Sequence, residues 1–155
     1  MYLQRTCYAI ERSRIHLNGV DDSNLDKHQI SNYLACVSAV IFYSEMEECL
    51  KSIVRKRLNV DVDGKLGTFL NKTNEKMLSR MKRKELSETI GLFGDDCEEE
   101  FKRRFPPEEI APYHNVISER HLTAHGSGSN ITLNDVETAV NVGERILVAV
   151  EEIIA

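Results

Sequence analysis

The sequence has few residues that break helices and almost no strand pattern. Only three prolines occur among its 155 residues, all between positions 106 and 112. Alternation of β-branched residues is nearly absent, whereas apolar residues recur at three- and four-residue spacing along most of the chain. This pattern predicts an all-α fold, a bundle of four to six helices in which four long helices are joined by short ones.

Paired cysteines and common metal-binding motifs are also missing. The four cysteines are widely separated and form no CxxC motif, and no HExxH motif occurs. A disulfide framework and a zinc knuckle are therefore not indicated. We expect no metal, no cofactor and a reducing, cytoplasmic compartment.

Long apolar runs are absent too. The first seven residues lack the apolar core of a signal peptide, and no later segment approaches a membrane-spanning length. We therefore expect no membrane association. A length of 155 residues suits one domain with a substantial core, so residues 1–155 are predicted to form a single domain.

The formal net charge of -5 argues against a protein that coats nucleic acid nonspecifically. Positive charge is nevertheless clustered. One group recurs at helical spacing and would form a basic stripe able to follow an RNA backbone: Lys72, Lys76, Arg80 and Arg83. Nearby glutamates dilute this charge, so an ordinary solvated helix surface is the alternative.

Helical spacing and capping residues predict where the long helices lie. The first ends near Asn18, and a long second helix ends near Asn59. A third is expected from Leu66 to Met81. Pro112 suits the first turn of a helix that runs to about His125, because the missing proline N–H costs nothing there. The capping box at residues 132–135 begins the last helix.

The long second helix is expected to bury one apolar stripe, which comprises Ile30, Leu34, Val37, Val40, Tyr43, Leu50 and Val54. One carboxylate, Glu47, is expected on that stripe. Its neighbours Glu45 and Glu48 fall off that stripe and are expected to be solvated. Buried carboxylates are rare unless they are paired. We therefore predict that Glu47 holds Arg120 or His121 in place. The alternative is a carboxylate at the edge of the stripe that reaches water.

The most informative segment is Arg120-His121-Leu122-Thr123-Ala124-His125-Gly126, at the end of a predicted helix. An arginine can hold phosphate, and a histidine can move protons near neutral pH. On an ideal helix Arg120 lies about 140° from His125, because each residue advances about 100°. A site completed by a second copy of the chain therefore fits better than a site within one copy.

Two other interpretations of these histidines remain open. His121 and His125 have the i, i+4 spacing of metal ligands, although no third ligand is evident in the sequence. A histidine at a helix C-terminus can also be purely structural, because the helix dipole favours positive charge there.

The segment from Arg120 to Gly126 resembles the R-x(4–6)-H motif of HEPN domains (higher eukaryotes and prokaryotes nucleotide-binding). In that motif a polar residue commonly follows the arginine, as His121 does here. The order of a long second helix, a motif-bearing helix and a closing apolar helix is also similar to HEPN domains. Residues 66–104 have no clear counterpart and are predicted to be a helical insertion.

The resemblance implies a homodimer whose motifs face each other across a cleft. It further implies a metal-independent endoribonuclease of the toxin or defence type, with RNA as substrate and an antitoxin or a nucleotidyltransferase as partner. His125 would transfer protons while a ribose 2′-OH attacks phosphate, Arg120 would neutralise the transition state, and His121 would position phosphate. The alternative is a non-catalytic HEPN module for dimerisation or for nucleotide or RNA binding.

Overall fold

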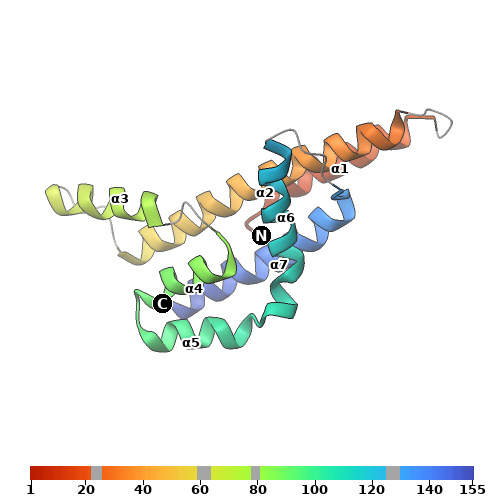
Figure 1. Ribbon diagram of the computed structural model, residues 1–155. Coiled ribbons are helices and arrows are strands. Elements are labelled where there is room, and N and C mark those ends of the chain that lie inside the picture. The colour runs from red at the N-terminus through yellow and green to blue at the C-terminus, as the bar shows by residue number, and fades with distance from the viewer. Residues whose placement is uncertain (22–25, 59–63, 78–80, 125–129) are drawn as a thin grey trace. The chain divides into compact units, whose positions relative to one another are not determined.

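The computed structural model describes residues 1–21, 26–58, 64–77, 81–124 and 130–155, without the side chains of residues 66, 71, 74–77 and 120–124. These residues form seven helices and no strand, which confirms the all-α fold. Four helices are long and three are short (Figure 1). In chain order they are α1 (Gln4–Asn18), α2 (Lys27–Leu58), α3 (Lys65–Met77), α4 (Arg83–Gly91), α5 (Asp95–Arg104), α6 (Pro107–Ala124) and α7 (Leu133–Ile153).

The chain divides into two compact units, and each is built from separate stretches of sequence. The first unit comprises Met1–Glu45 and Ala111–Glu144. The second comprises Met46–Ile110 and Arg145–Ala155. Three helices, α2, α6 and α7, therefore contribute residues to both units.

The core of the first unit is centred on an aromatic pair. The rings of Phe42 and Tyr113 are edge-to-face, with centroids 5.8 Å apart and planes at 79°. Both side chains are fully buried, and this geometry is favoured by the quadrupoles of the two rings. Burial also raises the pKa of Tyr113 well above its usual range, so its phenol stays protonated at all physiological pH values.

The buried face of α2 in this unit differs from the predicted one. Val37 and Val40 were expected in the core but are 56% and 45% exposed. Ala35, Ala39 and Phe42 are buried instead. Apolar side chains occur on more than one side of α2, so their spacing alone does not identify the buried face. The buried face of this part of α2 includes two small residues, Ala35 and Ala39.

In the second unit α4 packs against α5. Phe101 and Phe105 are buried with ring centroids 5.2 Å apart, and the Arg145 guanidinium lies 5.8 Å from the centre of the Phe105 ring. The Nε–H of Arg83 donates to the carbonyl of Phe105 at 2.8 Å. Arg83 therefore fixes the start of α4 to the segment that follows α5.

The predicted helix from Leu66 to Met81 is confirmed as far as Met77, and residues 78–80 lie outside the described part of the chain. Helix α3 ends at Met77, and Met81 lies outside both α3 and α4 with only 1% of its surface exposed. Burying Met81 in the core of the second unit takes precedence over the local helical spacing.

The start of α6 also differs from the prediction. The helix begins at Pro107 rather than at Pro112, with Glu108 and Glu109 in its first turn. Pro107 occupies the position where a missing N–H costs nothing, and the two carboxylates suit the positive end of the helix dipole. Pro112 lies inside the helix, where it has no N–H to donate to the preceding turn.

Candidate functional site

The segment that carries the arginine and histidine pattern falls at the C-terminal end of α6. The backbone of Arg120 and His121 is helical, and α6 ends at Ala124. The side chains of Arg120 and His121 are outside the described part of the structure, and so is the whole of His125. The angle between Arg120 and His125 therefore remains a prediction. Catalysis, metal binding and helix capping remain alternative interpretations of these residues.

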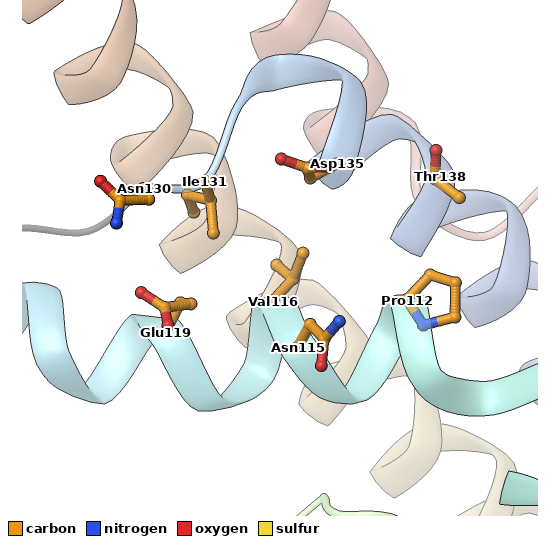
Figure 2. Close-up of a pocket in the computed structure, with 8 residues that line it drawn as sticks. All are labelled: Pro112, Asn115, Val116, Glu119, Asn130, Ile131, Asp135 and Thr138. Carbon is orange, nitrogen blue, oxygen red and sulfur yellow. The ribbon is translucent and has the colours of Figure 1, made fainter. Parts of the chain in front are cut away.

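A groove of about 430 Å³ lies beside this segment, entirely within the first unit (Figure 2). One wall is formed by α6, and its last contributing residue, Glu119, directly precedes Arg120. The opposite wall is formed by the chain entering α7 and by the first turns of that helix. The lining residues are Pro112, Asn115, Val116, Glu119, Asn130, Ile131, Asp135 and Thr138.

The groove combines an apolar floor with polar edges. Val116 and Ile131 lie between its walls and are buried, with 1% and 7% of their surfaces exposed. Glu119 and Asn130 come from opposite walls and lie at the same end of the groove, as Figure 2 shows. Five of the eight lining residues are polar and three are apolar, so the groove is more polar than the usual small-ligand site.

A capping box holds the α7 wall in position. The backbone N–H and the hydroxyl of Thr132 both donate to Oδ2 of Asp135, each at 2.8 Å. In return the N–H of Asp135 donates to Oγ1 of Thr132 at 3.2 Å. The capping box predicted at residues 132–135 is confirmed, and it fixes the side chain of one groove residue, Asp135.

Glu47 is half-buried at the edge of the apolar stripe of α2, which fits the alternative interpretation rather than a fully buried carboxylate. Its side chain is 27% exposed and accepts a hydrogen bond from Nζ of Lys51 at 2.7 Å, one turn along the same helix. Glu45, expected in solvent, is the buried one, with 4% of its surface exposed. A contact of Glu47 with Arg120 or His121 remains a prediction. The contact that the structure shows is the ion pair of Glu47 with Lys51.

Glu45 caps the N-terminus of α1. It accepts hydrogen bonds from the backbone N–H groups of Arg5 and Thr6, both at 2.9 Å, and from the Thr6 hydroxyl at 2.7 Å. Burial by itself would raise the pKa of Glu45, but these bonds and the positive charge of Arg5 together lower it. Glu144 completes the cap by accepting the N–H groups of Tyr2 and Leu3, each at 2.7 Å.

A sequence signal for this cap existed but was missed. The residue at the N-cap position of α1 is Leu3, which has no side-chain acceptor for the free N–H groups of the first turn. A helix that begins without Ser, Thr, Asp or Asn at this position needs an acceptor from elsewhere. The sequence alone did not show which of the glutamates in α2 would provide it.

The four predicted RNA-binding cations do not form one stripe on one helix. Lys72 is exposed on α3, and Lys76 is on the same helix with its side chain outside the described part. Arg80 is not described. Arg83 begins α4 and bonds to Phe105, so it lies on a different helix from Lys72 and Lys76. Their binding to RNA remains a prediction.

Among the residues whose side chains are described, no three His, Cys, Asp or Glu side chains are grouped as a metal site would require. Over the same part of the chain, no helix combines the length and the hydropathy needed to span a membrane.

Comparison with known proteins identifies a family for the chain. No curated protein and no solved structure matches the chain. The sequence model of one family, described as RiboL-PSP-HEPN, matches residues 6–155. The match includes α1 through α7, the segment 66–104 that we predicted to be an insertion, and the Arg120–His125 motif. The chain therefore belongs to the RiboL-PSP-HEPN family, and the HEPN resemblance of its sequence is confirmed.

Proposed function

We propose that the protein is a metal-independent endoribonuclease that acts as a homodimer, with Arg120 and His125 at its catalytic site. The observation that supports this most strongly is the position of the motif in a HEPN-family chain. Residues 120–124 of the motif end α6 and directly follow Glu119, one of the residues that line the groove of the first unit. A substrate group held at that end of the groove would lie next to the motif in sequence and in space.

The proposed reaction is an internal transesterification. The ribose 2′-OH attacks the adjacent phosphorus, a 2′-O–P bond forms, the P–O5′ bond breaks, and a 2′,3′-cyclic phosphate and a free 5′-OH remain. His125 accepts the 2′-OH proton, or donates a proton to the leaving 5′ oxygen, which suits a side chain that titrates near neutral pH. Arg120 neutralises the extra negative charge on the pentacoordinate transition state.

Two copies are proposed because Arg120 and His125 would be about 140° apart if both lay on one ideal helix. In a dimer, each copy supplies one or both groups to a shared cleft. His121 would position phosphate there. A toxin or defence role, with an antitoxin or a nucleotidyltransferase as partner, belongs to the same proposal and rests on family membership.

The test is cleavage of mixed RNA by the purified protein in EDTA, followed by sequencing of the product ends. We expect products with cyclic phosphate ends from the wild type and none from His125→Ala or Arg120→Ala. Positioned proton transfer typically contributes about 10²–10⁴-fold, so the losses should be of at least that order. His28→Ala and Arg12→Ala, at exposed positions in the first unit, are the matched controls.

Two outcomes would contradict the proposal. If EDTA removes cleavage and zinc restores it, His121 and His125 form a metal site. If the wild type and His125→Ala are equally inactive on every RNA, the non-catalytic HEPN module becomes the better interpretation.

A further inference from the structure

One side of α2 in the first unit is apolar and exposed. Residues 30–44 of this helix include no acidic residue, no lysine or arginine and no histidine. Tyr33, Val37 and Val40 lie in this stretch and are 63%, 56% and 45% exposed. A helix without a charged side is normally buried on all sides. The exposed side of residues 30–44 is therefore the expected place for a partner.

Four exposed residues define this surface, which we call the outer face of α2: Tyr33, Val37, Val40 and Ser44. At about 100° per residue, they lie about 140–180° around the helix from Phe42. Phe42 packs on Tyr113 of α6 in the core of the first unit. The outer face of α2 thus points away from the contact with α6, so it differs from the surface proposed for the catalytic dimer.

The outer face of α2 is complementary to itself. Its four residues are separated by four, three and four positions, which is the spacing of the seam between packed helices. The order of these spacings is the same in both chain directions. In an antiparallel pair with a two-fold axis between positions 37 and 40, Val37 lies opposite Val40 of the other copy. The large side chain of Tyr33 then lies opposite the small side chain of Ser44, so the two surfaces can interlock.

The absence of charge favours a second copy over a different protein. Each copy carries a formal net charge of -5, so two copies repel each other on average. Contact through the outer face of α2 brings no like charges together. A different partner selected by opposite charge would find no charge on this face to recognise.

We infer that the outer face of α2 binds the same face of a second copy in antiparallel orientation. Because it lies away from α6, this contact goes beyond the proposed catalytic dimer and joins such dimers into larger assemblies. Residues 30–44 span about 22 Å and a helix is about 10 Å wide, so the contact covers about 220 Å² of each copy. A standard interface buries about 800 Å² of each partner. The contact is therefore weak and should form at concentrations above those that give the catalytic dimer.

A charge-swap experiment tests the antiparallel pairing. Sedimentation velocity of the wild type over a concentration series should show, at the upper end, a species heavier than the one at micromolar concentration. Val37→Asp and Val40→Lys should each raise the dissociation constant of this species at least about 10-fold, because each places a charge opposite an uncharged valine. The double variant should associate at least about 5-fold more tightly than either single variant, because two opposite-charge pairs then form across the axis.

Ile15→Asp is the matched control for the single variants. Ile15 is 52% exposed on α1, in the same unit but outside the outer face of α2. This change should leave the dissociation constant at its wild-type value. Circular dichroism of all the variants checks that their helices are intact.

Photocrosslinking tests the same contact without an added charge. Tyr33 and Tyr8 are both 63% exposed, so benzoyl-phenylalanine at each position in turn gives a probe on α2 and a control on α1. Irradiation of the position 33 probe should link two copies, and mass spectrometry should find the link near Ser44. The position 8 probe should give no such link. If a single charge variant loses its helical signal, this crosslink decides the question.

Several outcomes would overturn the inference. A wild type without a heavier species, or single variants that associate as the wild type does, would leave the outer face of α2 to a different protein. A double variant no better than the single ones, or a link from position 33 to position 33, would exclude the antiparallel pairing. Loss of the micromolar dimer in Val37→Asp would mean that this face holds the catalytic dimer itself, which contradicts a separate contact. None of these results depends on RNA cleavage, so the proposed reaction is tested independently.

Discussion

A carboxylate that loses most of its water on folding is stable only where donors replace that water, and Glu45 meets this condition. Two backbone N–H groups and one hydroxyl, all from Arg5 and Thr6, point at its oxygens. The sequence offers Glu45, Glu47 and Glu48 within one turn of α2. The face that packs on α1 determines which of them is buried, and helical spacing did not identify that face.

Replacing Glu45 should destabilise the protein in a pH-dependent way. At pH 7 we expect Glu45→Gln to lower the free energy of unfolding by about 1–3 kcal/mol, because an amide N–H₂ would face groups that are themselves donors. The folded pKa of Glu45 is lower than the unfolded value of about 4.3. Its stabilisation is therefore complete above that pH and is lost as the pH falls through the folded pKa.

Urea unfolding of the wild type and Glu45→Gln at several pH values between about 3 and 7 measures this difference. The gap between the two proteins should narrow at the acid end of the series. Glu47→Gln is the control on the same helix, and it should cost no more than about 0.5 kcal/mol, since its contact with Lys51 is an i, i+4 surface pair. A larger effect for Glu47 than for Glu45 would contradict the assignment of the cap.

At the scale of the helices, the sequence predicted most of what local chemistry determines. Apolar spacing predicts the C-terminal ends of α1 and α2, and the Thr132 and Asp135 side chains predict the capping box of α7. These predictions are confirmed. The non-helical position of Met81 and the early start of α6 were missed. Both depend on packing within the second unit, where Met81 and Ile110 are buried, and no local pattern encodes that packing.

The candidate site was also predictable only in part, because its groove depends on packing between two helices. Residues 120–124 of the motif form the end of α6, and this position could be read from the sequence because helical spacing is local. The groove beside it brings Glu119 together with Asn130 and Asp135 from the other side of the turn into α7. That grouping depends on how α6 and α7 face each other in the first unit. No spacing rule within either helix could indicate it.

The capping box gives a prediction for α7. Thr132→Ala removes the hydroxyl that accepts the N–H of Asp135 and donates to its carboxylate. The free energy of unfolding should fall by about 1 kcal/mol, within the range of 0.5–2 kcal/mol measured for such caps. Chemical denaturation followed by circular dichroism measures the change.

Thr138→Ala is the control on the same helix. The Thr138 hydroxyl only bonds back to the carbonyl of Asn134, four residues earlier, at an exposed position. Its loss should change stability by less than about 0.5 kcal/mol, because alanine has a higher helix propensity than threonine. Equal losses for the two variants would mean that the cap contributes no more than an ordinary helix side chain.

For the whole molecule, the dimer proposed for catalysis predicts a definite mass. Sedimentation velocity at micromolar concentration should show a species of twice the 17.7 kDa of one chain. His114→Glu, on α6, should weaken this association at least about 10-fold, because a two-fold axis would bring two new negative charges together. His28→Glu, at an exposed position of α2, should leave it unchanged.

A monomer at all concentrations up to about 100 μM would contradict a dimer held through α6. RNA cleavage by such a monomer would also remove the argument that a second copy completes the site. Dimers of equal strength for both variants would locate the interface away from His114.

The cap on α1 has a consequence for how the protein is made. Glu144 accepts the backbone N–H groups of Tyr2 and Leu3, across sequence separations of 142 and 141 residues. Ribosomes synthesise chains from the N-terminus, and domains usually fold as they emerge. Here the first helix leaves the ribosome long before Glu144, which accepts the two N–H groups immediately before that helix, has been synthesised. The nascent chain must therefore wait until residue 144 has been added before the unit that contains the motif can close.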